Sequence, residues 1–297
     1  MLDVAVIGCG IVGANVAYLL SQHKLRAAVF EKENDVSMGT TRANSAIVHA
    51  GYDPEPGTAM ARLNVRGSAL TKEQCAAFDV KYRQIGSLVL AFSDEEMATV
   101  RRLYENGVAN GVPGVRVLTR EETLAMEPNL SDAVCGALYA PSAAIVEPWD
   151  LALALAEAAV ENGVELHLET AVTGAEKISG GWRLHTAKGD FEARAVVNAA
   201  GVEADLVAAM AGEPGFTTIP SRGEYYLLDK SQGYVVNHVV FQCPNRDGKG
   251  VLVSPTVHYN LIVGPNAEPS GREDVSTQAD ALAFVREKAV KSVPGVN

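Results

Sequence analysis

The chain has 297 residues, a length that favours one large domain or two interleaved ones. Hydrophobic residues make up 47% and charged residues 21%, as is ordinary for a soluble globular protein. A net charge of −11 argues against nucleic acid or an anionic membrane as the main partner. No apolar run reaches the ~20 residues that span a bilayer, and the N-terminus lacks the basic start of a secretion signal. We therefore expect a cytoplasmic protein without a transmembrane segment.

The N-terminus has the pattern of a strand, a glycine turn, a helix and a second strand. The turn fits GxGxxG: Gly8 permits a tight turn, Gly10 lets the backbone approach a pyrophosphate, and Gly13 lets helix and strand pack closely. The helix N-terminus supplies amide donors and a partial positive charge. Glu31 ends the second strand and is placed to accept both ribose hydroxyls of an adenosine. Because these features occur together, we predict a dinucleotide site rather than a structural glycine turn.

The identity of the dinucleotide depends on a later loop, because FAD and NAD both carry ADP. Glu31 argues against NADP, whose 2′-phosphate it would repel, although the neighbouring Lys32 weakens this argument. Residues 36–57 are rich in Gly, Ser, Thr, Asn and Pro and are expected to form a long functional loop. Within it, Gly39–Gly51 offers hydroxyls, an amide, small side chains and His49. This composition suits the edge of a flat polar heterocycle.

The rest of the chain alternates helical and strand patterns. Two helices are expected to open on capping boxes, Ser93 with Glu96 and Thr119 with Glu122. A second glycine turn, at 198–201, leads from a strand into a helix. We expect helices over 58–78, after Ser93 and Thr119, over 148–163 and over 277–291. We expect strands over 86–92, 115–118, 164–168, 171–177, 182–186, 195–198, 224–228, 235–241, 250–256 and 260–263.

The cysteines and most of the histidines lie too far apart to form a metal site. No two of the four cysteines form a CxxC pair, and we expect buried thiols in a reducing compartment. We therefore predict no metal ligand among Cys9, Cys75, Cys135, Cys243, His23, His167, His185, His238 and His258.

Several blocks of the sequence resemble one enzyme family, the D-amino-acid-oxidase-type superfamily of FAD-dependent oxidoreductases. Within it, the likeness is greatest to the anaerobic, soluble type of glycerol-3-phosphate dehydrogenase, followed by the L-2-hydroxyglutarate dehydrogenases. The blocks cover almost the whole chain, and they are Gly39–Tyr52, Pro56–Thr58, Leu63–Gly67, Asn198–Gly201, Arg222–Tyr226, Gly250–Thr256 and Gly264–Pro265. One departure is Tyr259, which stands where the similar proteins tend to have a small residue and is expected to narrow the substrate pocket.

The resemblance implies an α/β fold with an α+β second domain: a Rossmann-like FAD-binding domain interleaved with a mixed-sheet substrate domain. We expect the FAD-binding domain to comprise residues 1–79 and 146–215, and the substrate domain residues 80–145 and 216–297. The similar proteins continue beyond the position of Asn297. We therefore expect this chain to be a fragment that lacks the last strand and helix of the FAD-binding domain.

The resemblance also implies which residues contact FAD. They come from the two glycine turns, the end of the second strand and the long loop. The expected cofactor-binding residues are Gly8, Gly10, Ile11, Val12, Gly13, Glu31, Lys32, Thr40, Thr41, Ala43, Asn44, Ser45, His49, Val172, Ala199, Ala200 and Gly201.

The expected reaction removes a hydride from a secondary alcohol carbon to flavin N5 while a base takes the hydroxyl proton. His49 is the preferred base because histidine is the side chain that titrates near neutral pH, but it could instead only hydrogen-bond the flavin or a carbonyl. Arg222 is the candidate clamp for a phosphate or carboxylate, although a structural pair with Glu224 is nearly as plausible. Tyr52 and Tyr225 are the other expected substrate contacts.

Two small anionic alcohols fit this chemistry. The preferred substrate is sn-glycerol 3-phosphate, which would be oxidised to dihydroxyacetone phosphate, and the alternative is L-2-hydroxyglutarate or another 2-hydroxy acid. The electron acceptor is not identified by the sequence. A third hypothesis, of a different class, is a truncated and non-catalytic nucleotide-binding remnant.

Overall fold

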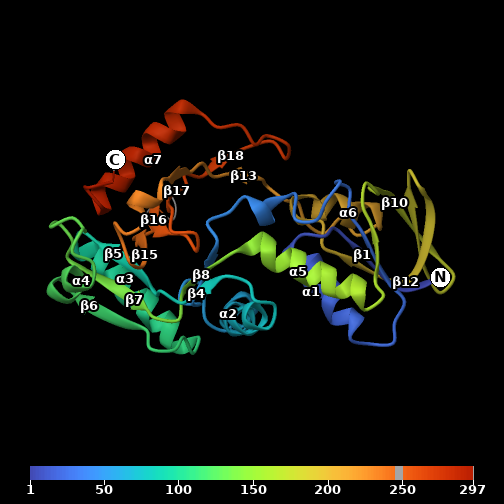
Figure 1. Cartoon of the computed structure of the whole chain (residues 1–297), viewed down its shortest axis with the longest axis horizontal. Coiled ribbons are helices and arrows are strands. Elements are labelled where there is room, and N and C mark those ends of the chain that lie inside the picture. The colour runs from blue at the N-terminus through green and yellow to red at the C-terminus, as the bar shows by residue number, and fades with distance from the viewer. Residues whose placement is uncertain (245–249, 297) are drawn as a thin grey trace. The chain divides into compact units, whose positions relative to one another are not determined.

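A computed structural model describes residues 1–244 and 250–296 of the chain (Figure 1). The chain divides into two compact units. Unit 1 comprises Met1–Asn44 and Pro148–Pro220, and unit 2 comprises Ser45–Glu147 and Ser221–Asn297. These boundaries differ from the expected domain segments mainly in residues 45–79, which pack within unit 2. The assignment of functional domains stays a prediction, and each unit is described by itself below.

Unit 1 is built on a six-stranded sheet with the order β10-β11-β12-β1-β2-β9. The strands β12, β1, β2 and β9 run parallel, whereas β10 and β11 form an antiparallel meander with β12. The bounds are β1 (Leu2–Ile7), β2 (Ala27–Phe30), β9 (Glu165–His167), β10 (Val172–Ile178), β11 (Gly181–Thr186) and β12 (Gly189–Asn198). Because parallel strands bring their carboxyl ends to one edge, the segments after β1, β2 and β12 meet there.

The helices of unit 1 follow from the local sequence. In α1 (Ile11–Ser21) the buried positions Gly13, Ala14 and Ala17 are small, so the helix lies close against the sheet. Helix α5 (Pro148–Glu161) begins at a proline and packs beside α1, and α6 (Ala204–Met210) packs on β10. Gly163 follows α5 with φ +96°, a conformation that glycine adopts without strain. The expected helix stop is therefore confirmed.

Unit 2 contains a seven-stranded mixed sheet with the order β14-β17-β16-β15-β5-β7-β6. Only β15 and β5 pair in parallel. A three-stranded sheet has the order β3-β8-β4, and β13 pairs with β18. The bounds are β3 (Ile47–Val48), β4 (Tyr82–Arg83), β5 (Ser87–Ala91), β6 (Arg116–Thr119), β7 (Gly136–Ala140), β8 (Ala144–Val146), β13 (Ser221–Arg222), β14 (Tyr226–Leu228), β15 (Val239–Gln242), β16 (Leu252–Pro255), β17 (Leu261–Gly264) and β18 (Glu268–Pro269).

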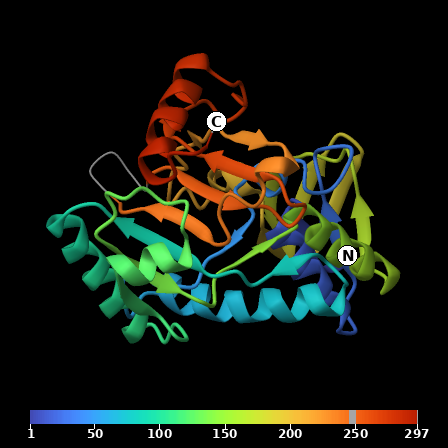
Figure 2. The same ribbon diagram turned by 60° about the vertical axis from the view of Figure 1, so that its left-hand side comes forward.

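The α-helices in the described part of unit 2 are α2 (Ala59–Ala77), α3 (Asp94–Ala109), α4 (Arg120–Met126) and α7 (Ala279–Ser292). At α4 the expected capping box forms in both directions between Thr119 and Glu122. At α3 the expectation is half right: the Ser93 hydroxyl accepts from the amide of Glu96, but the Glu96 carboxylate accepts from Phe92 rather than from Ser93. Helix α7 lies along the strands near β16 and β17 in Figure 2 and buries Val285 and Ala289 in the core of unit 2.

Within the described parts of the chain, no helix is long and apolar enough to cross a membrane. The same residues contain no group of three or more acidic, histidine or cysteine side chains arranged to bind a metal. The mixed architecture of sheets and helices matches the expected fold class.

Candidate functional site

Steric contacts show that the first glycine turn requires glycine. Gly8 has φ +95°, and a Cβ there would lie 2.6 Å from the carbonyl oxygen of Ala199. A Cβ at Gly13 would lie 1.9 Å from the carbonyl oxygen of Gly8. The turn therefore has the close strand-to-helix packing that the sequence predicts, and the second glycine turn lies against it.

The N-terminus of α1 faces the long loop of unit 1. Gly10 has no side chain to cap the helix, and the amide of Ile11 donates to Thr41 Oγ1 at 3.0 Å. Thr40–Arg42 forms a short 3₁₀ turn, and the Asn44 amide group donates to the carbonyl oxygens of both Thr40 and Thr41. Hydroxyls and helix amides are thus gathered at one helix terminus, which suits a phosphate group.

Glu31 is held by the backbone around it. The side chain is 7% exposed, and its carboxylate accepts from the amides of Cys9 at 2.7 Å and Glu33 at 3.0 Å. A carboxylate has about four lone-pair sites, so two of them are left for further donors. The amide of Thr170 donates to the Glu31 carbonyl oxygen, which places the start of β10, and with it Val172, near this acid.

The second glycine turn is also rigid. The amide of Ala199 donates to the carbonyl oxygen of Ile7 at 2.9 Å, which ties the turn to the end of β1. The Asn198 side chain accepts from the amide of Ala200 and donates to the carbonyl oxygen of Ala204. Gly201 has φ +57° and starts the short turn Gly201–Glu203.

The side chains of unit 1 fit the ADP portion of FAD. A Cβ at Gly39 would meet nothing within 4 Å, so the loop leaves open space. The hydroxyl of the buried Ser37 has no hydrogen-bond partner among the described residues. A helix terminus whose N-cap residue has no side chain, a fixed carboxylate and an unpartnered buried hydroxyl supply the donors and acceptors that a pyrophosphate and a ribose require.

The same geometry makes one cysteine unreactive. Burial raises the pKa of Cys9 to about 12, and the charges of Glu31 and Asp35 add to this shift. The reactive thiolate is therefore scarce at neutral pH. We expect iodoacetamide at about pH 8 to alkylate the exposed Cys135 and to leave Cys9 intact in the folded protein, as measured by peptide mass spectrometry. Equal labelling of the two thiols would contradict the buried environment of Cys9.

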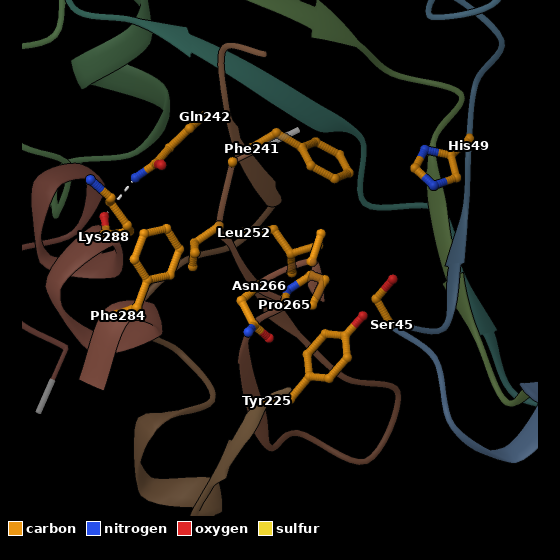
Figure 3. Close-up of a pocket in the computed structure, with 13 residues that line it drawn as sticks. Ser45, His49, Tyr225, Phe241, Gln242, Leu252, Pro265, Asn266, Phe284 and Lys288 are labelled. Atoms are coloured by element: carbon orange, nitrogen blue, oxygen red, sulfur yellow. Dashed lines mark hydrogen bonds between the residues drawn. The ribbon is translucent and has the colours of Figure 1, made fainter. Parts of the chain in front are cut away.

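Unit 2 contains a cavity of about 190 Å³ (Figure 3). Of the residues predicted from the sequence, Ser45, His49 and Tyr225 line it. The other lining residues come from β15, β16, the segment after β17, and α7: they are Phe241, Gln242, Gly250, Val251, Leu252, Pro265, Asn266, Ala267, Phe284 and Lys288. None of these residues is among the site residues predicted from the sequence, because they are far apart in sequence and the fold brings them together.

His49 and Tyr225 are differently placed in the cavity wall. The His49 ring stacks on Phe241 with 5.8 Å between ring centroids, and the residue is exposed. Burial raises the pKa of Tyr225, an effect opposed by its hydrogen bond with Ser45; in Figure 3 the Tyr225 hydroxyl points toward Ser45. Tyr226 packs instead against the core cluster of the sheet, so the two tyrosines do face opposite sides as expected.

Arg222 is not among the described residues that line the cavity. Its guanidinium donates to Glu224 Oε1 at 3.0 Å, to Asp274 Oδ2 at 2.5 Å and to Ser276 Oγ at 3.1 Å. The buried Glu224 also accepts from the amide of Gln278, the N-cap of α7. These contacts fasten the segment before α7 and include the pair with Glu224 that the alternative hypothesis anticipates, while the role of Arg222 as a substrate clamp stays a prediction.

We expect Arg222→Ala to lower the melting temperature clearly, because the buried carboxylate of Glu224 would lose its cation. The loss of such a partner typically costs about 3 kcal/mol. Thermal unfolding followed by circular dichroism measures this effect. Arg183→Ala removes an exposed ion pair with Glu192 and serves as the control with little expected change. Equal stability of the Arg222→Ala variant and the wild-type protein would contradict the structural role.

Tyr52 and Tyr259 lie outside the lining of this cavity, and their expected roles stay predictions. Tyr52 is 6% exposed and packs in a core cluster of unit 2, where burial raises the pKa of its hydroxyl and Ser87 hydrogen-bonds it. Tyr259 lies at φ +67° in the turn between β16 and β17, stacked on Tyr234 with Arg83 over its ring. Neither residue lines the cavity, so neither contacts a ligand there.

Comparison with known proteins identifies the family. Residues 3–297 match the model of the DAO family, described as FAD dependent oxidoreductase. The chain is 48% identical to a glycerol 3-phosphate dehydrogenase of Caloramator mitchellensis over 99% of its own length and 61% of that protein. It is 32% identical to an L-2-hydroxyglutarate dehydrogenase of Escherichia coli over 90% of its length and 64% of that protein. The chain thus spans less than two thirds of these two relatives.

A solved structure gives the same result. L-alpha-glycerophosphate oxidase from Mycoplasma pneumoniae, with FAD bound, is 30% identical and superposes with a TM-score of 0.93. The alignment covers 100% of this chain and 79% of that one. The family, the fold class and the cofactor predicted from the sequence are therefore confirmed. This chain belongs to the DAO family of FAD-dependent oxidoreductases.

Proposed function

We propose that this chain is the FAD-binding and substrate-oxidising part of an sn-glycerol 3-phosphate dehydrogenase, which forms dihydroxyacetone phosphate. The observation that carries the proposal is the 48% identity with the dehydrogenase of Caloramator mitchellensis over nearly the entire chain. The glycerophosphate oxidase of Mycoplasma pneumoniae acts on the same substrate class and supports it.

In this proposal, unit 1 binds the ADP portion of FAD. The amides at the start of α1 and the hydroxyls of Thr40 and Thr41 hold the pyrophosphate, and Glu31 accepts from the ribose hydroxyls. When bound, FAD supplies the hydride acceptor that oxidation of an alcohol requires. Lys32, Ala43, Asn44, Val172 and the second glycine turn complete this site as predicted contacts.

The cavity of unit 2 receives the substrate. His49 accepts the proton of the alcohol hydroxyl at its imidazole, while stacking on Phe241 fixes the plane of the ring. Ser45 and Tyr225 offer hydroxyl donors to the oxygen atoms of the substrate. Among the described residues that line the cavity, Lys288 is the one lysine and there is no arginine, so we assign it the phosphate in place of Arg222.

We expect Lys288→Met to raise KM for sn-glycerol 3-phosphate about tenfold with a smaller change in kcat, because a lost charge-assisted contact costs about 1.5 kcal/mol. Steady-state kinetics with an artificial electron acceptor measures both constants. The control is Lys291→Met, which removes a neighbouring lysine of α7 that pairs with Glu96 and does not line the cavity. The assignment fails if the two variants have the same KM.

A second candidate substrate is L-2-hydroxyglutarate, which the 32% identity with the Escherichia coli dehydrogenase favours. It is also a small anionic secondary alcohol. The two candidates are separated by the initial rate at which each substrate bleaches the flavin band near ~450 nm under anaerobic conditions. Faster bleaching by L-2-hydroxyglutarate would overturn the proposed substrate. Retained flavin that neither substrate bleaches would favour the non-catalytic remnant. The electron acceptor stays unidentified.

A further inference from the structure

The carboxyl edge of the unit 1 sheet carries an ion pair between two segments that are far apart in sequence. Lys32 Nζ donates to Glu203 Oε1 at 2.9 Å. Lys32 lies just beyond the end of β2, and Glu203 ends the short turn that follows β12. The strands β12 and β2 flank β1 on either side. The pair therefore passes across the carboxyl end of β1, where Gly8 begins the dinucleotide turn.

Both ends of this ion pair are anchored to rigid backbone. Next to Lys32, the carboxylate of Glu31 accepts from the amides of Cys9 and Glu33. The amide of Glu203 donates to the carbonyl oxygen of Ala200 at 3.0 Å, within the second glycine turn. The two side chains are only partly covered, with exposed fractions of 49% and 29%. The ion pair is therefore partly exposed to solvent and connects two segments whose backbone is held by hydrogen bonds.

In parallel α/β sheets the nucleotide occupies the crevice at the carboxyl ends of the strands. We propose that Lys32 and Glu203 form a strap across this crevice that slows the release of bound FAD, with Glu203 as the residue that positions Lys32. The strap must open for the dinucleotide to leave, and closing it restores an attraction between two opposite charges. Glu203 also keeps the Lys32 ammonium from folding back onto Glu31, whose carboxylate stays available to the ribose.

The test uses the purified holoprotein, which is diluted into buffer without FAD. The rate of FAD release is measured from the rise in the fluorescence of free FAD. We expect Glu203→Gln and Lys32→Met each to release FAD about two- to fivefold faster at low salt, the range of an exposed ion pair. The double variant is expected to be no faster than either single one, because both remove the same contact. Lys32→Arg keeps the charge and is expected to release FAD at nearly the wild-type rate. Salt of about 1 M should remove the difference.

The chain offers a matched control at the opposite end of the same sheet. Arg183 and Glu192 pair at 3.0 Å with exposed fractions of 38% and 39%. Each cation also has a second, longer contact at 3.7 Å: Arg183 with Glu176, and Lys32 with Glu33. Glu192→Gln is expected to release FAD at the wild-type rate.

Three results would overturn the strap. The first is release from Glu203→Gln at the wild-type rate. The second is an equal acceleration by Glu192→Gln, which would point to a general loss of stability. The third is faster release from Lys32→Met but not from Glu203→Gln, which would show that Lys32 holds the cofactor without help from Glu203. If the wild-type protein bound no flavin, the proposed cofactor site itself would be wrong. Failure of the strap and failure of the cofactor site are therefore distinguishable.

Discussion

Gly13→Ala is expected to abolish FAD binding and to destabilise the protein strongly. The added Cβ would lie 1.9 Å from the carbonyl oxygen of Gly8, so the helix and the turn must separate. Overpacking of this kind costs about 1–3 kcal/mol or more, and here the displaced atoms are backbone. Because the same turn carries the amides that face the pyrophosphate, a small displacement removes the binding geometry as well. Flavin content after gel filtration and thermal unfolding measure the two effects.

The control for this substitution is Gly215→Ala in the same unit. A Cβ at Gly215 would meet nothing within 4 Å, so the variant is expected to keep both FAD and stability. If Gly13→Ala bound FAD as the wild type does, the turn could not be the pyrophosphate site. If both variants lost stability equally, the loss in Gly13→Ala could not be assigned to the steric contact, because Gly→Ala at an unstrained position is expected to stabilise the fold by reducing the entropy of the unfolded chain.

His49→Ala is expected to retain FAD. The rate at which the substrate reduces the bound flavin is expected to fall about 10²- to 10⁴-fold, which is the usual contribution of a general base. The physical reason is that the hydroxyl proton must leave as the hydride departs, and no other described residue lining the cavity is a neutral-pH base. Single-turnover reduction followed by stopped-flow absorbance isolates this step from reoxidation. His49→Gln keeps a polar side chain that cannot act as a base, and it is expected to be equally slow.

His23→Ala provides the comparison, because His23 is exposed in unit 1 and lies outside the cavity. Its single-turnover rate is expected to equal that of the wild-type protein. An undiminished rate in His49→Ala would remove this residue as the base. Loss of flavin from the same variant would favour the other hypothesis, in which His49 only holds the cofactor.

The parts of the fold that depend on local patterns could be predicted from the sequence. The glycine turn needs only neighbouring residues to define it, and the cap between Thr119 and Glu122 spans three positions. The short strands Ile47–Val48 and Tyr82–Arg83 could not be predicted, because two residues carry no alternation pattern. The boundary between the two units after Asn44, which falls within the long loop, was not predicted either. It depends on which segments pack together.

The site was predictable only where function depends on local backbone. Gly8 and Glu31 are recognisable because the turn and the strand end have fixed spacing. Arg222 is predicted as a substrate clamp because arginine suits a phosphate or carboxylate. Its hydrogen bond with Asp274, a residue distant in sequence, is visible only in the fold. Lys288 carried no signal beyond its place on an amphipathic helix.

The most direct test of the account adds sn-glycerol 3-phosphate to the purified chain without oxygen and measures the flavin spectrum and the product. The account predicts about one FAD per chain, bleaching of its band near ~450 nm, and an equal amount of dihydroxyacetone phosphate. A folded protein without FAD, or a bound flavin that stays oxidised in excess substrate, would contradict it.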